Sequence, residues 1–257
     1  MKPTLTSRPE APPSAAVVVV HGLNTKPEIM DELIGFLLEN GFACVRVSLN
    51  DADSGARTPP CELASAWADR VELGIEEAQN AFPNIPVDVL GFSTGAMASL
   101  AFINSRHYSS IDRMFLLAPP VALRFISRVV RLLIPLWRLG LGLPSAAPRS
   151  VRHRSWTPFS EYGALMLMHD NLRHPSKREF LGAIDTRIAV DSRDELVDLH
   201  GVSEWVDDND LNGWTVQPIR NRDARGRVYR HLVMTRAALG PAGWQSLTGD
   251  LLEHLRR

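Results

Sequence analysis

The chain has 257 residues, of which 45% are hydrophobic and 22% charged, and its formal net charge at pH 7 is -1. These values are typical of one α/β domain with a sizeable core and with room for an insertion. The near-neutral charge argues against nucleic acid as the main partner, because domains that bind phosphate backbones carry a clear basic excess.

The start of the chain carries no sign of export. It lacks the apolar core of a signal peptide, and the run AAVVVV at 15–20 is too short to span a membrane, so we expect a cytoplasmic protein. Residues 1–14 are expected to form a flexible tail, which leaves no room for an N-terminal β-hairpin. Cys44 and Cys61 belong to no C-x-x-C pair or Cys/His cluster, so we expect no disulfide, metal or cofactor.

From Ala15 onward, apolar runs of strand length alternate with segments of helix length, which is typical of a mostly parallel α/β sheet with helices on both faces. The predicted strands lie at 15–20, 42–49, 87–90, 112–118, 187–190 and 214–219. The predicted helices lie at 27–40, 67–80, 96–104 and 244–255. The alternation breaks between about 120 and 182, which indicates an insertion within a domain that spans 15–257.

The third strand runs into the pentapeptide Gly91-Phe92-Ser93-Thr94-Gly95, and a helix of small residues follows. Glycines on both sides of a serine fit a tight strand-to-helix turn that exposes the hydroxyl as a nucleophile. Such a string also arises by chance, so the string alone is weak; the strand before it and the helix after it favour the nucleophile over a turn serine. A serine nucleophile needs a base, an acid and donors for the oxyanion.

The first strand ends in His21-Gly22-Leu23-Asn24. This turn can aim the backbone N–H of Leu23 at the edge of the sheet where the serine lies, and with the N–H of Thr94 at the start of the next helix it would form an oxyanion hole. We interpret His21 as a histidine satisfied within its own turn rather than as a chemical group.

These motifs, the long insertion after LLAPP, and an acid and a histidine in the order Ser, Asp, His resemble the α/β-hydrolases, in particular the monoacylglycerol lipase and lysophospholipase-like esterases. The resemblance covers essentially the whole chain from Ala15. It implies the α/β-hydrolase fold, a helical cap at about 120–182, and a Ser-His-Asp triad.

The family pattern places the acid after the strand that follows the insertion, two residues before an apolar pair. Asp194 matches this pattern, and Asp191 at the strand edge is the alternative. Glu195 and Asp198 are expected to be solvated. The histidine should follow the last strand and precede the last helix, where His231 lies; His200 is too close to Asp194 along the same loop to reach Ser93.

The insertion is basic and apolar, with seven arginines and no acidic residue between 121 and 160. The spacing of Arg124, Arg128, Arg131 and Arg138 predicts one face of a helix, which Pro135 should kink or divide. Two interpretations remain open. The cap contacts lipid or an anionic membrane surface and lines an acyl pocket, or it is an ordinary cap with solvated arginines.

The sequence therefore predicts a serine hydrolase with the triad Ser93, His231 and Asp194, acting on small-molecule esters or lipids with a medium or long acyl chain. A peptidase or amidase with the same triad is one alternative. A non-catalytic binding protein of the same fold is another.

Overall fold

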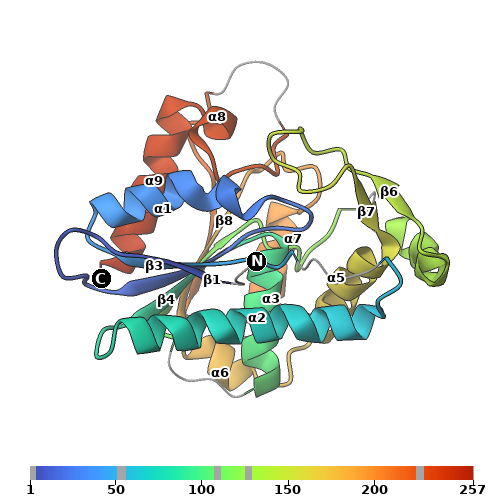
Figure 1. The fold of residues 1–257 in the computed structure, drawn as a ribbon, viewed down its shortest axis with the longest axis horizontal. Helices are drawn as coiled ribbons and strands as arrows, with labels where there is room; N and C mark the ends of the chain where they lie inside the picture. Colours follow the sequence, from blue (N-terminus) through green and yellow to red (C-terminus); the bar gives the residue numbers. More distant parts are fainter. Residues whose placement is uncertain (1–3, 51–55, 107–110, 125–128, 224–228, 257) are drawn as a thin grey trace.

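The computed structural model describes residues 4–50, 56–106, 111–124, 129–223 and 229–256. A seven-stranded sheet in the order β1-β3-β2-β4-β5-β8-β9 forms its centre, parallel except between β1 and β3 (Figure 1). The strands of this sheet are β1 (Thr4–Ser7), β2 (Ala16–Val20), β3 (Ala43–Val47), β4 (Val87–Phe92), β5 (Arg113–Leu117), β8 (Asp185–Val190) and β9 (Trp214–Pro218). This confirms the mostly parallel α/β sheet predicted from the sequence, and β2 to β9 of the sheet match the predicted strands.

Helices cover both faces of the sheet. The helices α1 and α9 lie on one face, and α2 and α3 lie on the other (Figure 1). The helical segments outside the insertion are η1 (Pro27–Met30), α1 (Asp31–Glu39), α2 (Pro60–Ala81), α3 (Thr94–Arg106), α7 (Leu199–Asp208), α8 (Arg236–Leu239) and α9 (Pro241–Leu255). Because both faces are covered, the central strands β2 and β4 are buried along their whole length.

The order of the strands determines where a ligand can bind. The chain moves from β2 to β3 on one side and later returns to β4 on the other side of β2. Loops that leave the carboxyl ends of β2 and β4 therefore diverge, and such a switch point opens a crevice in α/β sheets. The two motifs that the sequence singles out, HGLN and GFSTG, leave the sheet at these two strand ends.

The expectation of a flexible tail over residues 1–14 is wrong at its start, because Thr4–Ser7 forms β1. This strand pairs antiparallel with β3, with Thr4 opposite Val47 and Ser7 opposite Cys44. The segment is short and Leu5 is its one apolar residue, so its sequence has no apolar alternation that would indicate a strand. It is a strand because the edge of β3 supplies hydrogen-bond partners to its backbone.

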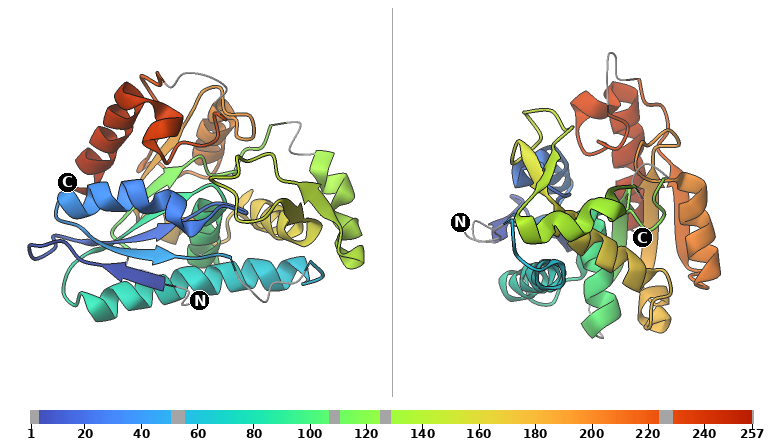
Figure 2. Two further views of the ribbon diagram at one scale, coloured as in Figure 1. Left: turned by 45° about the horizontal axis from the view of Figure 1, so that its top comes forward. Right: turned by 90° about the vertical axis from the view of Figure 1, so that its right-hand side faces the viewer.

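The insertion joins β5 to β8, which are neighbours in the sheet. Its described elements are η2 (Val130–Leu139), β6 (Gly142–Pro144), β7 (Trp156–Pro158), α5 (Phe159–Leu172) and α6 (Arg178–Gly182). Strands β6 and β7 pair as a small antiparallel sheet, and the two views in Figure 2 place it with η2 and α5 beside one end of the central sheet. We call residues 120–182 the cap.

The helix predicted across the arginine-rich part of the cap has a different form. Residues 130–139 form a 3-10 helix that contains Pro135, and Arg128 lies outside the described residues. Proline has no N–H for the α-helical bond and its ring crowds the preceding turn, which favours the tighter helix. Gly140, at a φ of 72°, ends it. No residue of η2 is buried.

Within the described residues, no helix is long and apolar enough to cross a membrane.

Candidate active site

Ser93 lies at the sharp turn between β4 and α3, in a backbone conformation that side chains seldom adopt. Its φ is 50°, and its N–H donates to the carbonyl oxygen of Leu117 at 2.8 Å. A Cβ on Gly91 would lie 2.7 Å from the Cα of Ala96, and a Cβ on Gly95 would collide with carbonyl oxygens at the end of β2. The glycines are therefore required because the helix starts in contact with two strands.

Three residues from distant parts of the chain meet at this turn. The Nε2 atom of His231 lies 2.8 Å from the Oγ of Ser93, and its Nδ1 lies 2.8 Å from the Oδ2 of Asp194. In the neutral ring Nδ1–H donates to the carboxylate, which leaves the Nε2 lone pair to accept the serine proton. The structure thus brings together the three residues that the sequence predicts as a triad.

The environment of Asp194 favours its charged form. Burial raises its pKa, but the hydrogen bond and charge of His231 and two backbone N–H groups lower it by more, so the pKa lies below its ordinary value. Those N–H groups belong to Leu196 and Val197, the apolar pair, and donate to Oδ1 at 2.7 and 3.0 Å. Oδ1 thus accepts hydrogen bonds from the backbone of its own loop, while Oδ2 faces His231.

The alternative acid, Asp191, lies elsewhere. Its carboxylate accepts hydrogen bonds from the side chain of Arg222 at 2.8 Å and from the N–H of Arg193 at 2.8 Å. His200, which the sequence excludes as the base, is exposed on α7 and pairs with Glu204. Both residues therefore pair with groups other than Ser93 and His231.

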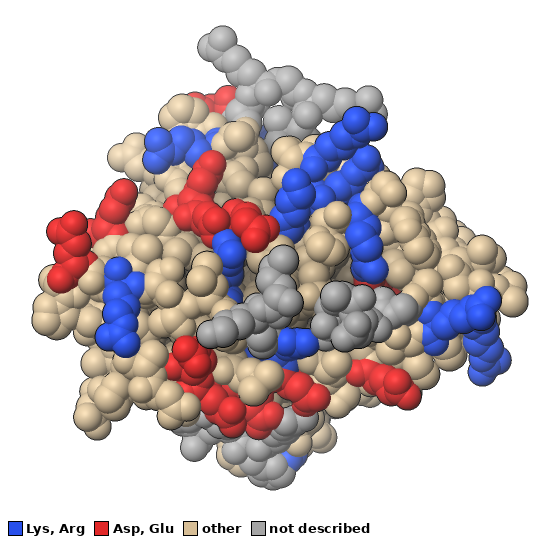
Figure 3. All heavy atoms as spheres, in the orientation of Figure 1, with Lys and Arg blue, Asp and Glu red and all other residues tan. Residues whose placement is uncertain are grey.

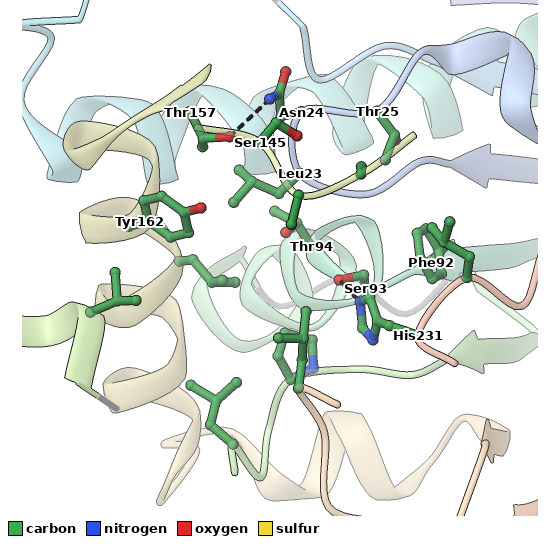
Figure 4. A pocket seen from close by; sticks show the side chains of 18 of the residues that line it. Leu23, Asn24, Thr25, Phe92, Ser93, Thr94, Ser145, Thr157, Tyr162 and His231 are labelled. Atoms are coloured by element: carbon green, nitrogen blue, oxygen red, sulfur yellow. Dashed lines mark hydrogen bonds between the residues drawn. The ribbon is translucent and has the colours of Figure 1, made fainter. Parts of the chain in front are cut away.

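The predicted oxyanion donors border the serine. Leu23 and Thr94 line the same cavity as Ser93 (Figure 4). Thr94 begins α3, and the first N–H groups of a helix have no acceptor within it. A Cβ on Gly22 would lie 2.7 Å from the ring of Phe92, so the loop after β2 packs directly on the turn.

His21 agrees with its interpretation as a satisfied histidine. The ring is buried, its Nδ1 lies 2.7 Å from the carbonyl oxygen of Gly22, and its Nε2 accepts the N–H of Leu49 at 3.0 Å. Burial lowers its pKa to about 4. The neutral ring therefore joins the loop after β2 to the end of β3.

The role of Asn24, which follows Leu23, is not indicated by any sequence pattern. Its side chain contacts cap residues 154, 156 and 157, and its hydrogen bond to Thr157 is drawn in Figure 4. The φ of 49° at this position is unusual for a residue other than glycine. An asparagine at the end of a short motif carries no signal for a partner about 130 residues away.

A cavity of about 310 Å³ opens at Ser93 between the sheet and the cap. Its walls are mainly apolar, and no Asp or Glu is among its described lining residues. From the cap, the lining residues that carry larger apolar side chains are Leu123, Val130, Tyr162, Leu165 and Met166. Within the ranges that the structure describes, no group of three or more His, Cys, Asp or Glu side chains could hold a metal ion.

The fold is similar to that of solved lipases and esterases. A soluble variant of monoglyceride lipase from Saccharomyces cerevisiae, in complex with a substrate analog, gives a TM-score of 0.74 at 14% identity, over 98% of this chain and 90% of the lipase. One of the metagenome-derived lipolytic enzymes LipS and LipT gives 0.70 at 16% identity, over 99% and 97% of the two chains. A thermostable carboxyl esterase from Bacillus coagulans, in complex with glycerol, gives 0.65 at 14% identity, over 98% and 93%.

No curated protein matches the sequence. Residues 11–229 match the family described as serine aminopeptidase, S33. Since this match spans most of the chain and the solved structures share its α/β-hydrolase fold, the chain belongs to the serine aminopeptidase S33 family.

Proposed function

We propose that the protein is a serine hydrolase that cleaves carboxylic esters with a medium or long acyl chain. The observation that carries this proposal is the position of His231, whose two ring nitrogens lie 2.8 Å from Ser93 and 2.8 Å from Asp194. A hydroxyl becomes a useful nucleophile when a base accepts its proton and a carboxylate orients that base.

In the proposed reaction, Nε2 of His231 takes the proton of Ser93 as Oγ attacks the ester carbonyl carbon. The N–H groups of Leu23 and Thr94 donate to the oxyanion of the tetrahedral intermediate. The intermediate expels the alcohol, which leaves with the proton held by His231. Water then attacks the acyl-enzyme, again losing its proton to His231, and releases the acid and free Ser93. Asp194 stabilises the imidazolium at each step.

The cavity favours an ester over the amino end of a peptide. An aminopeptidase must pair the buried ammonium group of its substrate with a carboxylate, because an unpaired buried charge is costly. The described lining residues offer no carboxylate, and the walls suit a hydrocarbon chain. A volume of about 310 Å³ is at the low end of ligand sites, so we expect a medium chain to fit best.

Two assays test the proposal. A fluorophosphonate probe should label the wild type and should not label Ser93→Ala, and an unlabelled folded wild type would contradict catalysis by Ser93. Among p-nitrophenyl esters, kcat/KM should rise from acetate to a medium chain and should exceed that of leucine p-nitroanilide. A preference for the anilide would favour a peptidase, and a maximum at acetate would refute an acyl pocket.

We propose further that the cap meets an anionic lipid surface. Within η2, the residues Leu132 and Leu139 are 80% and 63% exposed, and arginines lie on the same segment. On the face shown in Figure 3, blue Lys and Arg side chains gather over the cap side, while red acidic side chains lie mainly over α1 and the lower edge. Exposed leucine beside arginine is a combination that binds the interface of anionic bilayers.

Vesicle sedimentation tests this contact. The wild type should sediment with vesicles containing phosphatidylglycerol more than with pure phosphatidylcholine, and Leu132→Asp should reduce that binding. The same variant should keep its activity on a soluble short-chain ester. Equal sedimentation of wild type and Leu132→Asp would mean that η2 is not the contact, and the cap would then be an ordinary one.

A further inference from the structure

The catalytic histidine lies on a segment without helix or strand. Residues 229–235 connect to α8 through turns and bends, yet His231 must keep two ring atoms at 2.8 Å from their partners. Backbone groups in such a segment receive no partners from regular structure and need them from elsewhere.

Arg222 supplies the partners of the carbonyl groups. Its side chain is 4% exposed, and all five N–H donors of its guanidinium are used. The acceptors lie on both sides of His231. They are the carbonyl oxygens of Tyr229 (2.9 Å), Arg230 (2.7 Å), Leu232 (3.2 Å) and Ala238 (2.9 Å), and the Oδ2 of Asp191 (2.8 Å).

Asp191 fixes the guanidinium to the end of β8. Its side chain is 5% exposed, and its other oxygen accepts the N–H of Arg193. A buried guanidinium requires a carboxylate close by, since an unpaired buried charge is strongly destabilising. The buried charge of Arg222 therefore explains why position 191 carries a carboxylate, and this reason requires no contact with the histidine ring.

Glu195 supplies the partners of the N–H groups. Its Oε1 accepts the N–H of Arg230 at 2.8 Å, and its Oε2 accepts the N–H of His231 at 2.9 Å. Its neighbour Asp194 holds the ring of the same histidine. Two consecutive carboxylates thus bind the side chain and the backbone of His231. Glu195 is exposed, as expected, and it also accepts these two backbone N–H groups.

We propose that Arg222 and Glu195 are positioning residues that hold the backbone at His231 in the geometry required for proton transfer. The inference rests on the proposed function, since it gives these residues a role only if His231 is the base. Arg222 restrains the carbonyl groups and Glu195 restrains the N–H groups, so the ring enters the site at a fixed place and angle. A displacement of about 1 Å at a catalytic group can lower a rate on the order of 100-fold.

The test compares Arg222→Ala with Arg220→Ala, which removes an exposed arginine two residues away. In Arg222→Ala we expect kcat on a soluble p-nitrophenyl ester to fall about 10- to 100-fold with little change in KM, because the acyl cavity does not include Arg222. Millimolar guanidinium should restore part of that kcat and should not stimulate Arg220→Ala. Rescue by a small cation distinguishes positioning from a general loss of fold.

Two further variants cover the case in which Arg222→Ala does not fold. Arg222→Lys keeps the charge opposite Asp191 but cannot reach all five acceptors, and Glu195→Gln keeps one acceptor but places an amide NH₂ against an N–H. Each should lower kcat with little change in KM, while the thermal unfolding temperature stays near that of the wild type. In each, the downfield proton resonance of the His231–Asp194 hydrogen bond should broaden or shift.

The outcomes separate the two proposals. If the folded wild type does not react with the fluorophosphonate, the proposed function itself fails. If the wild type reacts and turns over esters while folded Arg222→Lys and Glu195→Gln keep the kcat of Arg220→Ala, the positioning role is refuted and the catalytic one stands.

Discussion

At the scale of the residue, Asp191 and Asp194 are identical side chains three positions apart with different tasks. Asp194 faces the imidazole of His231, and Asp191 faces the guanidinium of Arg222. Each carboxylate also accepts N–H groups of its own loop, so each is held in place. Their difference comes from which segment of the chain lies opposite each of them.

Replacing these acids one at a time tests that division. We expect Asp194→Asn to lower kcat about 10³- to 10⁴-fold, because the amide favours the wrong histidine tautomer and cannot stabilise the imidazolium. In Asp191→Asn the triad stays complete, so the loss in kcat should be at least tenfold smaller than in Asp194→Asn. This variant should also have a lower thermal stability than the wild type. Steady-state kinetics and thermal unfolding of both variants give the answer; a larger kcat loss in Asp191→Asn would reverse the assignment.

At the scale of the element, the turn between β4 and α3 depends on glycine. A Cβ on Gly95 would collide with backbone oxygens of Val20 and His21, which cannot move without displacing β2. We expect Gly95→Ala to lower kcat at least 100-fold and to destabilise the fold by about 2 kcal/mol or more, since the added methyl overpacks the contact.

The matched control for this change is Gly249→Ala in α9, where an added Cβ meets nothing within 4 Å. There alanine should stabilise the helix by about 0.5–1 kcal/mol and leave kcat unchanged. Urea unfolding and ester hydrolysis measure both effects. An active Gly95→Ala enzyme would mean that α3 and β2 can move apart without harm to the site.

A second contact between elements joins the loop after β2 to the cap. The side-chain NH₂ of Asn24 lies 2.8 Å from Thr157 Oγ1, its side-chain oxygen accepts the N–H of Arg154 at 2.9 Å, and its carbonyl accepts the N–H of His153. The next residue, Thr25, forms an isolated antiparallel bridge with Arg152. The loop that carries the Leu23 N–H therefore has the cap as part of its support.

The substitution Asn24→Gly removes the side-chain contacts while glycine tolerates the φ of 49°. We expect a loss of about 2–3 kcal/mol in stability, at roughly 1 kcal/mol for each hydrogen bond, and a lower kcat because the proposed oxyanion donor, the N–H of Leu23, is less well placed. Asn84→Gly, at an exposed turn with a φ of 68°, is the control. Unchanged kcat in Asn24→Gly would show that the oxyanion loop does not depend on the cap.

At the scale of the whole molecule, the buried carboxyl group of Asp88 in β4 links stability to pH. Burial raises its pKa from 3.8 to about 7, and the charge and backbone N–H of Arg113 offset this shift only in part. Between these values the folded protein holds a proton that the unfolded chain has released. The free energy of unfolding therefore falls as pH rises from about 4 to 7. Asp88 contributes at most about 1.4 kcal/mol per pH unit to this fall.

Asp88→Asn removes this dependence because the amide stays neutral. The gain in stability of the variant over the wild type should be larger at pH 8 than at pH 5. Urea unfolding of both proteins at several pH values measures the difference, and contributions from other groups, such as His21 with its lowered pKa, cancel in it. A difference that does not change with pH would mean that Asp88 is charged in the folded protein.

The sequence determined the sheet and the serine turn, because both depend on local patterns. Continuous β-branched runs such as β2 form strands covered on both faces. The glycines of GFSTG permit a tight turn in which the helix starts in direct contact with the neighbouring strands. The same patterns could not indicate β1, whose four residues include only one apolar side chain and form a strand because β3 lies beside them.

Only the tertiary structure decided which carboxylate faces His231 and what holds that histidine. Asp191, Asp194 and Glu195 lie within five consecutive residues, and the sequence pattern that favours Asp194 leaves Asp191 as an alternative. Their partners are Arg222, Arg230 and His231, which follow them in the chain after α7 and β9. Hydrogen bonds between distant segments depend on the path of the whole chain, so the division of tasks among these acids follows from the fold.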